Sequence, residues 1–149
     1  MGIVYDKLMN IGGDLVIETV DRIVNGNMET IPQDESITLK PAPKIFKDTC
    51  KIDWNKTSVE IHNLIRGLSP YPAAFTMVKD DKDRELGLKI YESEILDEKS
   101  ELPAGTLISD GKTLEFVTAD GVLRLIKVQL AGKKAMKAED LLRGTKLKS

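Results

Sequence analysis

The sequence holds few of the residue types from which active sites are usually built. It contains one cysteine, Cys50, and one histidine, His62, so an internal disulfide framework and a cysteine zinc cluster are both excluded. Aromatic residues make up 5% of the chain, too few for a ladder of side chains on which successive bases stack. No apolar run approaches the roughly 20 residues of a membrane-spanning helix, and the start lacks the basic flank and apolar core of a signal peptide. We therefore expect a protein of the reducing cytoplasm with no membrane contact.

The formal net charge of −2 conceals an uneven distribution. Residues 1–35 carry 2 basic and 7 acidic side chains, whereas residues 36–149 carry 20 basic and 17 acidic ones. The later and longer part is therefore weakly cationic, which argues mildly for a nucleic-acid partner. At 149 residues the chain is long enough for one ordinary domain with a sizeable core.

Two stretches have the periodicity of amphipathic helices. Residues 3–25 repeat apolar side chains at spacings of three and four, and Gly26 follows as a C-terminal stop. This helix needs a platform that the residues immediately after it do not provide. Residues 57–68 repeat the pattern, with Thr57 and Glu60 in the positions of a capping box. Between the two, residues 27–50 contain three prolines and no periodicity, which is typical of a connector.

The rest of the chain consists of short apolar runs separated by turns. Residues 113–118 alternate with a period of two, which predicts a strand with one buried face. Asp120-Gly121 supplies residues that tolerate positive φ, as a tight hairpin turn requires. Residues 122–129 are apolar on both faces, so we expect a central strand there, with further strands at 74–78, 86–95 and 106–109. The predicted fold class is mainly β with one inserted helix (α+β): a small open antiparallel barrel resembling an OB-type Greek-key fold, preceded by an N-terminal helix and an extended linker.

Cationic residues gather in two places, the connector and the C-terminal segment. The connector and its end carry Lys40, Lys44, Lys47 and Lys51, and the C-terminal segment carries Lys133, Lys134, Lys137 and Arg143. The connector is either a solvated linker kept soluble by its charge or an arm that follows phosphates. The two lysines after Gly132 belong either to an ordinary strand-to-helix turn, before a short helix at 138–142, or to a phosphate-facing loop.

No set of residues has the parts of a catalytic or metal site. His62 lies off the apolar face of its helix with no base, nucleophile or metal partner in sequence, so we expect an ordinary surface histidine; Cys50 is expected to be a bystander. The acidic run at 80–83 lacks the glycine and the glutamate of an EF-hand calcium loop. Gly111-Lys112-Thr113 ends like a phosphate-binding loop, but it stands between strands and lacks the first glycine of that motif.

Several segments, in order, are similar to the C-terminal domain of methionyl-tRNA formyltransferases and to the linker before it. The segment Leu-Ala-Gly-Lys-Lys-Ala-Met is the most specific, and the likeness extends over essentially the whole chain. Residues 3–26 resemble the last helix of the family's N-terminal formyl-transfer domain. The matching segments are Pro32–Ser36, Ala42–Asp48, Ile52–Trp54, Ile65–Ala74, Pro103–Thr106, Ala119–Gly121, Leu130–Met136 and Asp140–Leu142.

The resemblance implies three parts: residues 1–26 as the terminal helix of a truncated formyl-transfer domain, 27–50 as a basic linker and 51–149 as a β-barrel tRNA-binding domain. It implies an intact enzyme that transfers a formyl group from 10-formyltetrahydrofolate to initiator methionyl-tRNA in translation initiation. The family's catalytic asparagine, histidine and aspartate, and its Ser-Leu-Leu-Pro folate loop, have no match here. The fragment is therefore expected to hold no cofactor, no catalytic residue and no metal, and to be inactive alone. Its expected partners are initiator tRNA, the N-terminal domain and a second copy through the exposed N-terminal helix.

Eight basic residues are predicted to bind tRNA. By resemblance, Lys44, Lys47 and Lys51 fall at the family's basic linker positions, and Lys133 and Lys134 at its basic turn. Charge alone adds Lys40, Lys137 and Arg143. We expect them to recognise the backbone and shape of a folded RNA rather than its base sequence.

Two other functions remain open. A related formyltransferase acting on a sugar nucleotide or folate has a similar C-terminal domain that need not touch RNA. A free-standing OB-like module would bind nucleic acid with no enzyme attached. Salt-dependent binding to initiator tRNA discriminates against the first, and a formyl-transfer domain encoded directly upstream discriminates against the second.

Overall fold

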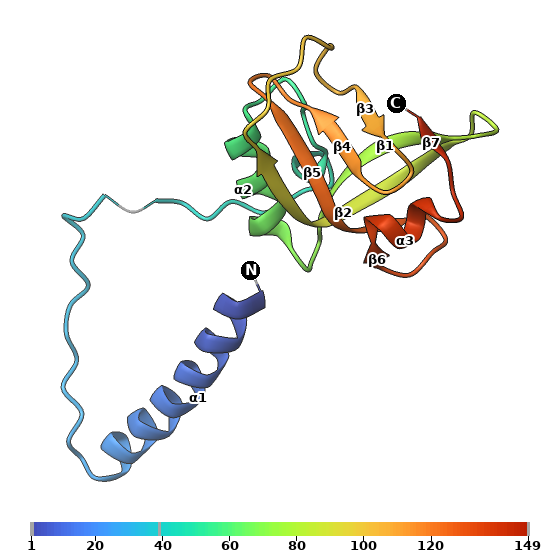
Figure 1. Ribbon diagram of the computed structural model, residues 1–149. Helices are drawn as coiled ribbons and strands as arrows, with labels where there is room; N and C mark the ends of the chain where they lie inside the picture. The colour runs from blue at the N-terminus through green and yellow to red at the C-terminus, as the bar shows by residue number, and fades with distance from the viewer. Residues whose placement is uncertain (1, 39, 149) are drawn as a thin grey trace. The chain divides into compact units, whose positions relative to one another are not determined.

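The computed structural model describes residues 2–38 and 40–148 and separates into two compact units, residues 2–44 and 45–149 (Figure 1). In the first unit, helix α1 spans Gly2–Val24. The Asn27 amide donates to the Arg22 carbonyl at 2.9 Å, and Gly26, at φ +69°, closes this Schellman end, as predicted. Residues 25–38 and 40–44 contain no helix or strand.

The second unit is built on an antiparallel sheet with the strand order β3-β4-β5-β2-β1-β7, and β6 pairs with β5. The two ends of this order, β3 and β7, contact each other, so the sheet is nearly closed into a barrel (Figure 1). The expected small antiparallel barrel is confirmed, with β5 in a central position between β4 and β2. The strands are β1 (Ala74–Asp80), β2 (Glu85–Leu96), β3 (Leu107–Ser109), β4 (Leu114–Val117), β5 (Val122–Leu130), β6 (Met136–Lys137) and β7 (Leu147–Lys148).

Helix α2 (Ser58–Leu68) packs on β2 and starts at the predicted capping box. The Thr57 hydroxyl accepts from the Glu60 amide at 3.3 Å, and the Glu60 carboxylate accepts from the Thr57 amide at 3.0 Å. Such a cap satisfies two amides that the helix itself leaves without partners. The apolar stripe of the helix is buried in the barrel core together with side chains from β1, β2, β4 and β5.

One aromatic pair ties the segment before α2 to the core. The Trp54 ring stacks on Phe116 of β4 with centroids 4.3 Å apart, and its indole N–H donates to the Thr76 hydroxyl of β1 at 3.0 Å. The pairing satisfies the polar end of the indole while its apolar surface is packed.

Strand β4 is buried on both faces, so the prediction of one buried face was wrong. Glu115 points away from the core side chains and is nevertheless covered, at 9% exposure. Its carboxylate forms an ion pair with Arg124 of β5 at 2.8 Å. A polar residue at an alternate position therefore does not identify a solvent face when a cross-strand partner covers it.

The expected positive φ at Asp120-Gly121 was also wrong, because neither residue has one. Limited space favours glycine there: a Cβ on Gly121 would lie 3.1 Å from the Glu98 carbonyl oxygen and 3.4 Å from the Ser58 hydroxyl. Asp120 connects this hairpin to α2, since its carboxylate accepts from the Ser58 amide at 2.7 Å. That hydrogen bond lowers the pKa of Asp120.

The C-terminal segment contains the predicted short helix and two strands that were not predicted. Helix α3 covers Ala138–Leu142 as expected, and Leu141 is buried against the core. Strands β6 and β7 have two residues each, too few to show a period of two in the sequence.

Candidate nucleic-acid interface

Lys47 is positioned by a short segment that is anchored to the barrel. The 3-10 helix η1 (Asp48–Cys50) follows it, and the Cys50 amide donates to the Lys47 carbonyl at 3.0 Å. Cys50 is buried in the core, and the Ile52 amide donates to the Phe75 carbonyl of β1 at 2.9 Å. Lys47 is therefore exposed yet held beside β1, and Cys50 acts as a core anchor.

The basic turn after β5 is held just as firmly. Gly132 has φ +80°, a conformation in which glycine is free of strain. The Lys133 amide donates to the Leu130 carbonyl at 2.9 Å, and the Gln129 side-chain amide donates to the Lys133 carbonyl at 2.9 Å. The Lys133 ammonium group donates to the Thr145 hydroxyl at 2.6 Å. The turn is thus a fixed platform for two exposed lysines.

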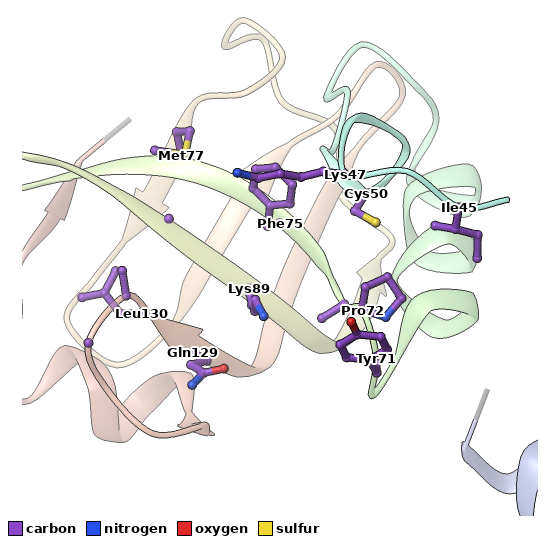
Figure 2. Close-up of a pocket in the computed structure, with 14 residues that line it drawn as sticks. Ile45, Lys47, Cys50, Tyr71, Pro72, Phe75, Met77, Lys89, Gln129 and Leu130 are labelled. Carbon is purple, nitrogen blue, oxygen red and sulfur yellow. The ribbon is translucent and has the colours of Figure 1, made fainter.

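A groove of about 700 Å³ joins these two segments across the outer face of β1, β2 and β5. Figure 2 shows Lys47 beside Phe75, with Lys89 between Phe75 and Gln129, and Met77 at the upper left. The structure therefore brings together one predicted linker lysine and the predicted basic turn. The lining residues are Ile45, Lys47, Cys50, Tyr71, Pro72, Ala73, Phe75, Met77, Gly87, Lys89, Gln129, Leu130, Ala131 and Gly132.

The charge around this groove, which we call the sheet groove, has one sign. Two lysines line it, and no aspartate or glutamate is among its lining residues. An apolar floor with cations and no carboxylates suits a phosphate chain, whose negative charge would otherwise meet repulsion.

Lys51 lies elsewhere. It lines a second hollow of about 540 Å³, together with Lys56 and three carboxylates, those of Asp48, Asp53 and Glu60. This mixture of charges would weaken the attraction of a polyanion. The structure thus separates Lys51 from Lys47, although only three residues lie between them in the sequence.

The remaining predicted residues differ in their surroundings. Arg143 forms ion pairs with Glu139 at 2.8 Å and Asp140 at 3.4 Å, and its hydrogen bond to Glu139 raises the pKa of Arg143. This pairing argues against a phosphate contact, while Lys137 precedes α3 and is exposed. Lys40 and Lys44 are exposed within the first unit. Binding of tRNA by the eight residues stays a prediction.

Apart from Lys47, the residues that line the sheet groove were not predicted as binding residues, and Gly87, Lys89 and Gln129 are the most informative of them. Lys89 and Gln129 are Cα partners, and Lys89 also pairs with Phe75, so the three side chains stand in one row across β1, β2 and β5. The alternation of Gly87 and Lys89 with the buried Leu88 and Ile90 would have placed both on an outer face. Their meeting with the basic turn depends on strand register, which the alternation does not determine.

His62 and Asp80, which the sequence analysis considered as possible site residues, have structural roles. His62 is half-buried rather than at the surface, and its Nδ1 lies 3.1 Å from the Ser93 hydroxyl of β2. Asp80 is buried in the β1–β2 hairpin, where hydrogen bonds from Arg84 lower its pKa and the Arg84 guanidinium pairs with it at 2.7 Å. Within residues 2–38 and 40–148, no three or more His, Cys, Asp or Glu side chains are grouped so as to hold a metal ion. No helix in these ranges is long and apolar enough to cross a membrane.

Fold and groove together define a small, mainly β domain with a nearly closed antiparallel barrel and a cationic groove on its outer face. The family described as "Formyl transferase, C-terminal domain" matches residues 44–146. The chain belongs to this family. It is 50% identical to a methionyl-tRNA formyltransferase of Phocaeicola vulgatus over 148 residues, and 47% identical to one of Bacteroides fragilis over 146 residues. Each alignment covers 95% of this chain and 45% of the relative, so the chain spans less than half the length of these relatives.

Solved structures with a similar fold include HypX from Aquifex aeolicus. One variant of HypX has a TM-score of 0.61 at 16% identity, covering 88% of this chain and 23% of HypX. HypX in complex with tetrahydrofolic acid has a TM-score of 0.60 at 16% identity, covering 87% and 22%. At this identity the likeness shows the fold alone.

Proposed function

We propose that this chain is the tRNA-binding C-terminal part of a methionyl-tRNA formyltransferase. The observation that carries the proposal is the family membership together with relatives of that name at 47% and 50% identity over nearly the whole chain. The intact enzyme would transfer a formyl group to initiator methionyl-tRNA in the cytoplasm. A donor of the folate type, 10-formyltetrahydrofolate, accords with the tetrahydrofolic acid complex of the fold relative HypX.

In this proposal the division of labour follows the three parts of the sequence. Residues 1–26 end the formyl-transfer domain, 27–50 link the domains, and 51–149 dock the tRNA. No residue of this chain is assigned to the folate or to the transfer step, because the family's catalytic set and folate loop have no match in the sequence. What the chain contributes is cations on the sheet groove and its basic turn.

Electrostatic docking of this kind gives modest affinity alone and becomes useful beside a second domain. A few phosphate contacts bind weakly at physiological salt, and tethering a second binding site raises the effective concentration of the first. Helix α1 has no buried residue within its own unit, and its large apolar side chains are more than half exposed. In the intact enzyme the formyl-transfer domain would cover them; in the isolated chain we expect self-association, which sedimentation velocity measures.

Titration with initiator tRNA at low salt tests the docking role. We expect saturable binding that weakens steeply as salt rises. A folded chain that shows no salt-dependent binding would instead favour a relative that acts on a sugar nucleotide or folate.

A chimera distinguishes the enzyme part from a free-standing nucleic-acid-binding module. This chain would replace the aligned segment, 45% of the length, of the Phocaeicola vulgatus relative. The chimera should formylate methionyl-tRNA, and the relative truncated before that segment should do so much more slowly. A folded chimera no better than the truncated relative would contradict the proposal.

A further inference from the structure

The floor of the sheet groove is bare at one position in the middle of a strand. Gly87 lies in β2, paired with Met77 of β1, and its carbonyl accepts from the Ala131 amide at 2.9 Å. Its φ is not positive, and a Cβ built on it would meet nothing within 4 Å. Glycine inside a strand weakens the sheet, because it has no side chain to pack and loses more backbone freedom on folding. Neither backbone conformation nor packing within the described unit accounts for glycine here, whereas close approach of another chain from outside would.

Beside Gly87 lies a row of outward-facing side chains with a lysine at its centre. Phe75, Lys89 and Gln129 face outward from adjacent strands, since each is paired with the next. Lys89 forms no ion pair with any residue the structure describes. Gln129 is fixed at both ends: it accepts from the Tyr91 hydroxyl at 2.6 Å and donates to the Lys133 carbonyl at 2.9 Å. The row therefore leads from β1 to the basic turn with an available cation in its centre (Figure 2).

The length of the row fits a polymer with several phosphates better than a single small anion. Crossing from β1 over β2 to β5 covers two inter-strand steps, about 10 Å. The row is therefore long enough to face more than one phosphate of a chain, whereas a single small anion would occupy only part of it. Lys47 and the turn extend the cationic path beyond it.

We propose that the sheet groove holds one strand of the tRNA sugar-phosphate backbone, which crosses β1, β2 and β5 directly above Gly87. Lys89 is the central phosphate-binding residue, between Lys47 and the lysines of the basic turn. Gly87 is the position that lets the strand reach the sheet. This inference rests on the proposed tRNA-binding function and adds a path and two residues to it.

Two sets of variants of the full 149-residue chain test the path by fluorescence anisotropy with labelled initiator tRNA. Lys89→Gln should reduce the slope of log affinity against log salt by about one and weaken binding about fivefold at 0.15 M salt. Lys99→Gln, which removes the same charge from an exposed loop, is the matched control. Gly87→Ala, Gly87→Val and Gly87→Phe should weaken binding progressively with side-chain size, to tenfold or more for Phe. Their melting temperatures should stay level or rise, because β-branched and aromatic residues suit a strand better than glycine.

The possible outcomes distinguish the proposed strand path from the proposed tRNA-binding function. If the parent chain binds tRNA and folded Lys89→Gln and Gly87→Phe variants bind equally well, the path is wrong and the tRNA-binding function stands. If the parent chain does not bind tRNA at low salt, both fail. If inorganic phosphate displaces tRNA at concentrations that leave ionic strength unchanged, the groove is a small-anion site and the strand proposal is overturned.

Discussion

Replacing Lys133 and Lys134 by glutamine would remove the two lysines of the basic turn and leave the two that line the sheet groove, Lys47 and Lys89. For each phosphate contact on a duplex, the log of affinity falls by about 0.9 per unit of log salt. Four contacts give a slope of about −3.6, and two give about −1.8. Raising the salt from 50 to 200 mM would then weaken the parent about 150-fold and the variant about 12-fold. The Lys133 ammonium group meets only an exposed hydroxyl, that of Thr145, so stability should change by no more than about 1 kcal/mol.

The assay is anisotropy with labelled initiator tRNA over a series of salt concentrations, with circular dichroism melts to establish folding. The matched control is the double variant Lys56→Gln with Lys99→Gln, which changes the net charge equally at exposed positions that belong neither to the groove lining nor to the basic turn. The control should keep the steep slope of the parent. An unchanged slope in a folded Lys133→Gln, Lys134→Gln variant, or an equal loss in the control, would refute the argument that these contacts are local.

Three further predictions concern a paired charge, two glycines and one titrating group. Arg143→Gln should leave the salt slope of tRNA binding unchanged, because two carboxylates already pair with this guanidinium; a slope reduced by one would contradict this. Gly121→Ala should lower the free energy of unfolding in urea by about 1 kcal/mol or more through its contact with a backbone oxygen, whereas Gly67→Ala, with open space in α2, should raise it by about 0.5–1 kcal/mol. Hydrogen bonds from the backbone amides of Thr113 and Lys112 lower the pKa of Asp110 from 3.8 to about 2. Its ionised form therefore stabilises the fold above pH 3.8, and the deficit in Tm of Asp110→Ala should shrink between pH 3.8 and about 2; a constant deficit would contradict this.

Features that depend on a few neighbouring residues could be predicted from the sequence. Thr57 and Glu60 cap α2 as their spacing indicates, and Gly26 ends α1 at positive φ. The central place of β5 also followed from its two apolar faces. In each case the signal and its structural consequence lie within one element or one turn.

Features that depend on register or on distant partners could not be predicted in this way. Gly121 resembles a turn glycine, but the carbonyl oxygen that limits the space for a side chain there belongs to Glu98, in the loop after β2. Lys51 continues the lysine series of the linker, yet its charge faces carboxylates brought near it by the chain around α2. Lys89 gains its place at the sheet groove only through the register of β1, β2 and β5. The sequence shows where the cationic residues lie along the chain, whereas the pairing of the strands determines which of them lie on the same surface.

The most direct test of RNA binding at the sheet groove is a backbone amide NMR titration of the isotope-labelled chain with initiator tRNA. Amides of Phe75, Gly87, Lys89 and Ala131 should broaden or shift first, at low salt, and recover as salt is raised. If these amides are unaffected while those around Lys51 and Lys56 respond, the RNA binds a different face and the assignment of the groove is wrong.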